Sequence, residues 1–223
     1  MTPGGDMFIG HYGVSLALKR AHPQLSLGGL FLAVQLLDVF FCLFVLLGVE
    51  KMRIVEGFTE YNAYDLYFMP YTHSLLGALV WATAAAAVVL LFWRAPAVAA
   101  ALVALAVFSH FVLDVPVHTP DLPLAAEASF KLGFSLWNHR WAALLLELLC
   151  LGTGLFLYLS SSRPKLPPGR WLALGVSALL VGLTVATPFL PAPASPQAFA
   201  VQALVSYFAL AALAVWLERS RSR

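Results

Sequence analysis

Charged side chains are scarce in this chain. Asp, Glu, Lys and Arg make up 11% of its 223 residues, and 61% of the residues are hydrophobic. A soluble domain would have roughly a quarter of its residues charged, so the composition excludes an ordinary soluble globular protein. The formal net charge is only +2. We therefore expect no nucleic-acid partner, because proteins that bind nucleic acids carry a strong basic excess.

The chain has few cysteines, and its N-terminal segment does not resemble a signal peptide. The two cysteines, Cys42 and Cys150, both fall inside apolar runs. We expect them to pack there as small apolar side chains, without indicating a redox compartment. The first 20 residues lack the pattern of a cleavable signal peptide, because Lys19 and Arg20 follow the apolar stretch instead of preceding it.

Long apolar runs dominate instead. A membrane-spanning helix needs roughly 20 consecutive, mostly apolar residues. Six runs reach that length, at residues 27–49, 72–93, 96–115, 137–159, 171–190 and 198–217. The sequence therefore predicts an all-α polytopic membrane protein with about six transmembrane helices. We expect it to be embedded in the lipid bilayer, with a short N-terminal half-helix before the first span.

The basic residues are unevenly shared between the two sides that six spans would create. Because basic residues are enriched in cytoplasmic segments, we expect a multi-pass protein of the cell (inner) membrane with both termini in the cytoplasm. Nine of the thirteen Lys and Arg residues support this orientation, namely Lys19, Arg20, Arg94, Arg163, Lys165, Arg170, Arg219, Arg221 and Arg223.

Five His and Asp residues in or beside the apolar runs form a candidate site. An aspartate at the centre of a span costs about 2.5–3.5 kcal/mol on insertion scales, so Asp38 should face the protein interior beside a partner. His11, in the half-helix, is expected at a similar depth. His110 and Asp114 share one helix face because they are four residues apart, and His73 lies near the start of the second run. This ligand set suits a divalent metal, with zinc the expected ion.

Two further residues are candidates for acid–base chemistry or for orienting the ligands. They are Glu147, within the fourth run, and His118, which follows Pro116 at the expected end of the third helix. Simpler interpretations stay open for each residue. A single histidine near the end of a span is usually only an interfacial polar residue, and Asp38 could serve as a hydrogen-bonded link between helices.

The polar residues also divide the chain into two parts. Between Arg170 and Glu218 there is no Asp, Glu, Lys, Arg or His. We therefore predict a transmembrane domain at 1–160 that carries the metal site, and two apolar helices at 161–223 that pack on it.

Four segments carry a resemblance to a known family. They read GHYGVSLAL, QLLDVF, YTHSLLGAL and FSHFVLD, and they cover residues 10 to about 115. In this pattern the chain resembles the predicted membrane-bound metal-dependent hydrolases, a multi-span family that includes LexA-regulated bacterial members. The chain has LLDVFF and YFMPYTHS where the family often has PDxDH-like and HRxxTHS stretches, so two potential ligands are missing. The resemblance implies these metal ligands: His11, Asp38, His73, His110 and Asp114.

The leading expectation is a membrane-embedded metal-dependent hydrolase that cleaves an ester or phosphoester in a small-molecule or lipid-derived substrate. The alternative is a small proton- or ion-coupled transporter, because buried Asp, Glu and His residues also form proton relays and ion pathways. A structural protein whose polar residues only connect helices is the third possibility. The sequence predicts no particular protein partner.

Overall fold

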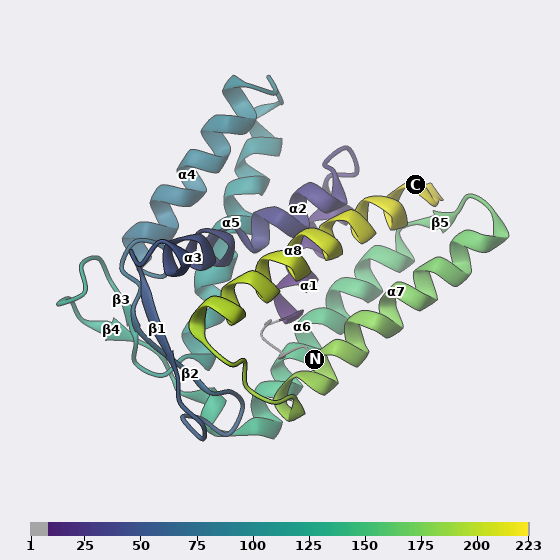
Figure 1. The fold of residues 1–223 in the computed structure, drawn as a ribbon. Helices are drawn as coiled ribbons and strands as arrows, with labels where there is room; N and C mark the ends of the chain where they lie inside the picture. Colours follow the sequence, from purple (N-terminus) through teal and green to yellow (C-terminus); the bar gives the residue numbers. More distant parts are fainter. Residues whose placement is uncertain (1–8, 223) are drawn as a thin grey trace.

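The computed structural model describes residues 9–222, and most of them are helical (Figure 1). The all-α prediction is therefore confirmed. The α-helices are α1 (Tyr12–Ala21), α2 (Leu27–Val34), α3 (Leu36–Leu46), α4 (Leu75–Leu91), α5 (Ala97–Val117), α6 (Arg140–Ser160), α7 (Pro167–Ala186) and α8 (Pro196–Arg219). Three short 3-10 helices lie at Ile9–His11, Leu136–Asn138 and Thr187–Phe189.

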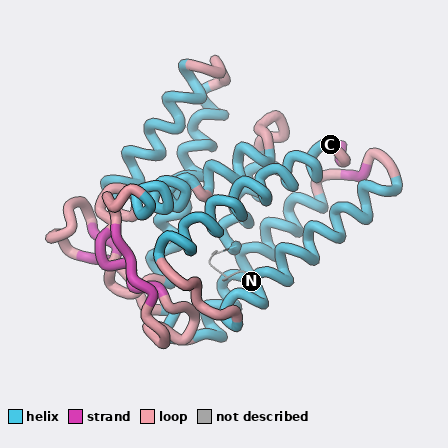
Figure 2. The backbone as a smooth tube through the Cα atoms, viewed as in Figure 1, coloured by secondary structure: helices cyan, strands magenta, loops and turns pink. Residues whose placement is uncertain are grey.

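The strands are short and form antiparallel pairs only, within the described residues (Figure 2). The longest pair, β1 and β2, covers one end of the helices as a hairpin. The pairs are β1 (Lys51–Ile54) with β2 (Tyr64–Phe68), β3 (Leu122–Pro123) with β4 (Lys131–Leu132), and β5 (Arg163–Pro164) with β6 (Arg221–Ser222).

Fewer helices than predicted are long enough to cross a bilayer. Within residues 9–222, α5, α6, α7 and α8 make four such helices, and α2 and α3 make a fifth if they are counted as one span bent by 55°. The predicted count of about six spans is not supported. The run at 27–49 breaks at Gln35, and α4 has only 17 residues because the chain before it forms a loop.

The helices pack in pairs around the N-terminal segment. α1 lies along α6, α4 forms a hairpin with α5, and α8 packs against both α2 and α3. Two glycines bring the backbones of α1 and α6 into contact. A β-carbon added at Gly154 would lie 2.2 Å from the carbonyl oxygen of Gly13, and one added at Gly13 would lie 2.1 Å from that of Cys150. Small residues of this kind allow close approach of transmembrane helices.

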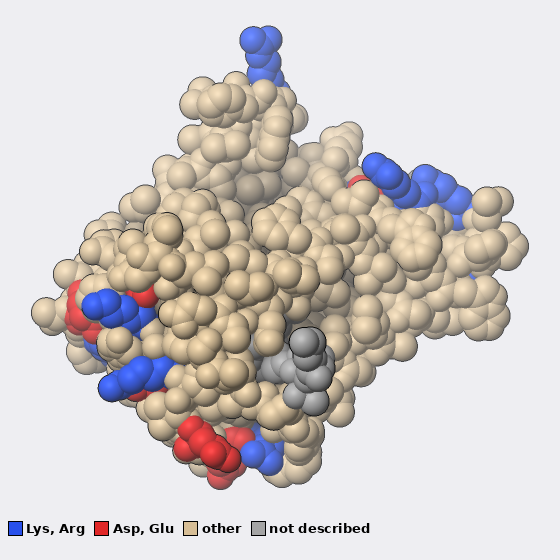
Figure 3. All heavy atoms as spheres, in the orientation of Figure 1, with Lys and Arg blue, Asp and Glu red and all other residues tan. Residues whose placement is uncertain are grey.

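Exposed aromatic side chains mark both ends of the apolar helices. At one end, Trp93, Trp171 and Trp216 are more than half exposed, and at the other end Phe134 and Trp141 are similarly exposed. Aromatic residues are enriched at the two membrane–water interfaces. In Figure 3, Lys and Arg gather at the α4–α5 tip and near the C-terminal end of α8. Most of the surface between this end and the opposite end of the molecule is uncharged. These features fit a membrane protein.

Candidate metal centre

α5 supplies the centre of the candidate site. His110 and Asp114 lie one turn apart and are almost fully buried, and His110 Nε2 lies 3.4 Å from Asp114 Oδ2. α5 ends at Val117, one residue beyond Pro116, so the expected helix end at this proline is confirmed. His118 is therefore the C-cap of α5. Its Nε2 lies 3.8 Å from Asp114 Oδ1.

A second carboxylate holds the other side of the His118 ring. His118 Nδ1 lies 2.9 Å from Asp121 Oδ1. Burial lowers the pKa of His118, but the carboxylates of Asp121 and Asp114 raise it by more, so that its pKa lies above the ordinary value. His118 is thus held between two carboxylates and belongs to the buried cluster.

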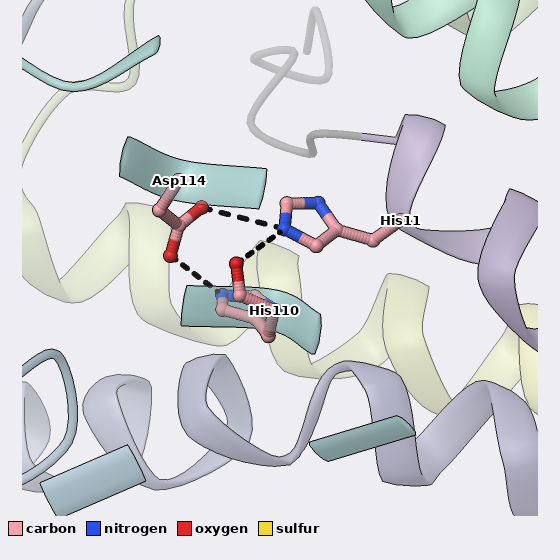
Figure 4. Close-up of side chains that lie close together, drawn as sticks. All are labelled: His11, His110 and Asp114. Carbon is pink, nitrogen blue, oxygen red and sulfur yellow. Dashed lines mark hydrogen bonds and ion pairs between the residues drawn. The ribbon is translucent and has the colours of Figure 1, made fainter. Parts of the chain in front are cut away.

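His11 reaches the cluster from the N-terminal segment (Figure 4). Its Nε2 lies 3.3 Å from Asp114 Oδ1 and 3.2 Å from the backbone oxygen of His110. The two imidazole rings stack with 4.2 Å between their centroids. Burial, and then the neighbouring His110, lower the pKa of His11, which favours the neutral ring. This position suits His11 both as a metal ligand and as a donor that orients Asp114.

Asp38 enters the cluster directly after the break between α2 and α3. Its Oδ1 lies 3.2 Å from His73 Nε2 and 3.5 Å from His110 Nε2. Next to the break, the backbone oxygen of Val34 accepts a hydrogen bond from His110 Nδ1 at 2.8 Å. The bend therefore brings a carboxylate to the site and also fixes the orientation of the central histidine.

His73 lies in the loop that precedes α4, and this loop dips into the protein. Its Nδ1 lies 2.8 Å from Thr72 Oγ1, and the Thr72 hydroxyl donates to Glu50 Oε2 at 2.6 Å. Because the hydroxyl proton is directed to Glu50, Thr72 Oγ1 accepts from the N–H of His73. Glu50 is itself held by the backbone N–H groups of Tyr71 and Thr72. The chain of contacts leaves His73 Nε2 facing the cluster.

Three histidines are consequently held in one tautomer. In their neutral forms His73, His110 and His118 donate through Nδ1, so each Nε2 carries a lone pair. Each Nε2 faces an oxygen of Asp38 or Asp114, which also carries lone pairs. Asp114 Oδ2 is buried and has no hydrogen-bond partner in the part of the chain that the structure describes. Lone pairs that face one another in a buried site repel unless a proton or a cation lies between them.

The spacing of these atoms fits a divalent metal ion. Ligand atoms bonded at 2.0–2.2 Å in a tetrahedral site lie about 3.3–3.5 Å apart. His110 Nε2 is 3.5 Å from Asp38 Oδ1 and 3.4 Å from Asp114 Oδ2, while His73 Nε2 is 3.2 Å and 3.9 Å from the same two oxygens. The ligand atoms of Asp38, His73 and His110 lie within 4.8 Å of one another, as do those of His11, His110 and Asp114. All five residues predicted as ligands meet.

Glu147 lies on α6 and lines the same cavity as the cluster. Its side chain is fully buried and accepts a hydrogen bond from the hydroxyl of Tyr61. Burial, and then the Glu147 carboxylate, raise the pKa of Tyr61 well above its ordinary value, so Tyr61 stays protonated and remains a donor. The cavity has a volume of about 60 Å³, which is enough for an ion and a few water molecules.

Several polar residues of the site were not predicted from the sequence. Tyr207 of α8 donates its hydroxyl to Asp38 Oδ2 at 2.8 Å, so a helix of the apolar C-terminal part also holds the site. A tyrosine in the middle of an apolar run was the available signal. Glu50 and Tyr61 lie in the segment at 50–70, whose acidic and aromatic residues made it a possible cap over a site, but the sequence did not single out these two residues.

Comparisons with known proteins identify no relative from which a function could be inferred. No family model, no curated protein and no solved structure matches the chain. The function must therefore be argued from the chemistry of the cluster itself.

Proposed function

We propose that this protein is a membrane-embedded metal-dependent hydrolase that cleaves an ester or phosphoester in a lipid-derived or membrane-accessible substrate. One observation carries the proposal. Asp114 Oδ2 is buried, has no hydrogen-bond partner among residues 9–222 and lies 3.4 Å from His110 Nε2, whose ring donates its other N–H to the backbone oxygen of Val34. A shared divalent cation explains this arrangement better than a hydrogen bond does.

In this proposal the metal is held by Asp38, His73, His110 and Asp114, with His11 as a fifth ligand or as the donor that orients Asp114. Zinc suits the mixture of imidazole and carboxylate ligands. A divalent ion at such a site lowers the pKa of a water molecule towards neutrality and polarises a carbonyl or phosphoryl oxygen.

The chain's own groups supply the remaining chemistry. Glu147 is the group that accepts the proton of the attacking water, and the hydroxyl of Tyr61 holds its carboxylate in place. Tyr207 orients Asp38 through the opposite oxygen of that carboxylate. Tyr61 and Tyr64, from the segment that forms β1 and β2, line the cavity and exclude bulk water from it.

Replacing the proton acceptor should separate catalysis from metal binding. For Glu147→Gln we expect hydrolysis to fall by about 10²–10⁴-fold, the range of general acid–base catalysis, with unchanged metal content. The measurement is the zinc-dependent cleavage of p-nitrophenyl butyrate, bis(p-nitrophenyl) phosphate and phosphatidylglycerol in detergent. Glu56→Gln is the matched control because Glu56 is exposed. Wild-type rates in Glu147→Gln would remove Glu147 from the mechanism.

A transporter is the second candidate, and one feature favours it. The break between α2 and α3 lies beside Asp38, and discontinuous helices often form the ion sites of transporters. Uptake of zinc or protons by reconstituted vesicles distinguishes the two functions. Metal-dependent flux without cleavage of any ester would support the transporter, whereas cleavage without flux supports the hydrolase.

We further propose that the protein lies in the cell (inner) membrane with both termini in the cytoplasm. The ends of α1 and α8 and the loop between α6 and α7 carry most of the basic residues, and basic residues are enriched on the cytoplasmic side. A reporter fused at the C-terminus should therefore report a cytoplasmic location, and one inserted between β3 and β4 an external location. The opposite result would place the metal site on the cytoplasmic side.

A further inference from the structure

A second cavity lies at the end of the helices opposite to β1 and β2. Its volume is about 490 Å³, within the roughly 300–1,000 Å³ range of small-molecule sites. The ends of α1, α6 and α8, the turn between α1 and α2 and the loop between α6 and α7 line it. The ionisable groups that line it are four cations and one carboxylate, Lys19, Lys165, Arg219, Arg221 and Glu218.

The single carboxylate is already paired inside the protein. Lys19 is 3% exposed and contacts Glu218 as well as the backbone oxygens of Pro23 and Leu25. The second oxygen of Glu218 accepts from the backbone N–H of Leu27 at 2.8 Å. Lys19 and Glu218 therefore neutralise each other and connect the C-terminal end of α8 to α1 and α2.

The other three cations keep their charge uncompensated. Lys165 donates to the backbone oxygen of Arg219 at 3.0 Å, and Arg221 donates to Ser162 Oγ at 2.7 Å. Neutral oxygens of this kind orient the cations without cancelling their charge. Among residues 9–222, no carboxylate forms a salt bridge with Lys165, Arg219 or Arg221. The cavity therefore carries an excess of positive charge.

The position of the cavity identifies the class of anion. Trp171 and Trp216 are 72% and 61% exposed and lie in the first turns of α7 and the last turns of α8, at the same end of the helices as the cavity. Exposed Trp residues of membrane proteins lie at the level of the lipid headgroups. Basic pockets between helices at this level bind anionic headgroups. We propose that this cavity binds the phosphate group of an anionic phospholipid.

The proposal is tested by the lipid dependence of thermal stability. Purified protein in neutral detergent receives phosphatidylglycerol, phosphatidylcholine or inorganic phosphate in titrated amounts. Stabilisation by phosphatidylglycerol alone is the expected result. Stabilisation by phosphatidylglycerol and inorganic phosphate alike would support the same phosphate site with a soluble source. Equal stabilisation by phosphatidylglycerol and phosphatidylcholine, or none by either anion, would overturn the proposal.

Variants assign the effect to the cavity. Each cation near an anionic surface contributes about 1 kcal/mol, or roughly fivefold in affinity, so Arg219→Gln should weaken phosphatidylglycerol binding about fivefold and Lys165→Gln/Arg219→Gln about 25-fold. Arg170→Gln is the control, since Arg170 is exposed near the same end but does not line the cavity. Loss of equal size in Arg170→Gln would indicate general surface charge and refute the site. The metal centre plays no part in this experiment, so the two proposals succeed or fail separately.

Discussion

Replacing His110 by alanine should lower the affinity for zinc by more than about 100-fold. His110 belongs to both groups of residues within 9–222 whose ligand atoms lie within 4.8 Å of one another, so neither group is complete without it. Residues that only orient ligands typically contribute 10–100-fold in affinity, and loss of a ligand should exceed that. The measurement is zinc stoichiometry and competition titration on detergent-purified protein of matched folding, with the exposed His139→Ala as control.

A second variant, which should weaken zinc binding by less than His110→Ala does, makes the same experiment more specific for the metal site. Tyr207→Phe removes only the hydrogen bond to Asp38 Oδ2, so its zinc affinity should fall by about 10–100-fold. Tyr71→Phe is the matched control, because Tyr71 is 54% exposed. If His110→Ala binds zinc as tightly as the wild type, the cluster is not a metal site. In that case the buried His and Asp residues are better interpreted as a proton relay.

The His and Asp residues of the buried cluster could be predicted because each depended on local chemistry. His110 and Asp114 share a helix face by their spacing alone, and Asp38 had to face inward because a bare carboxylate in lipid is costly. Which histidine meets which carboxylate depended on tertiary structure. Asp38 contacts His73 and His110, whereas His11 contacts Asp114.

The features that were not predicted depend on backbone conformation, which the sequence of an apolar run does not indicate. The run at 27–49 contains no proline that would predict the break at Gln35. Pro116 was expected to end α5, and the helix does end one residue later at Val117. The sequence did not show that the C-cap residue, His118, would lie beside Asp114. Proline lacks only its own N–H, so near a C-terminus the remaining turn can persist through other bonds, here from the His118 N–H to the Asp114 backbone oxygen at 2.9 Å.

The second large effect concerns the contact that positions His11. Gly13 follows His11 by two residues, and its backbone lies against Gly154. At Gly154 an added β-carbon would meet Gly13 O at 2.2 Å and Gly13 Cα at 2.5 Å. Both partners are backbone atoms, so no side chain can rotate away and the two helices must separate.

We therefore expect Gly154→Ala to destabilise the protein by about 1–3 kcal/mol, the usual range for overpacking, and Gly154→Leu by more. Gly152→Ala is the matched control on the same helix, since its added β-carbon meets nothing within 4 Å. Alanine is favoured over glycine in a helix by about 0.8–1.0 kcal/mol, so the control should be neutral or slightly stabilising. Thermal unfolding in detergent measures the difference, and zinc titration measures its effect on the site.

Because separation of α1 from α6 moves His11 away from Asp114, Gly154→Ala should also weaken zinc binding, while Gly152→Ala should not. Equal stability of the two variants would show that α1 and α6 are not in backbone contact. Destabilisation without weaker zinc binding would remove His11 from the metal site.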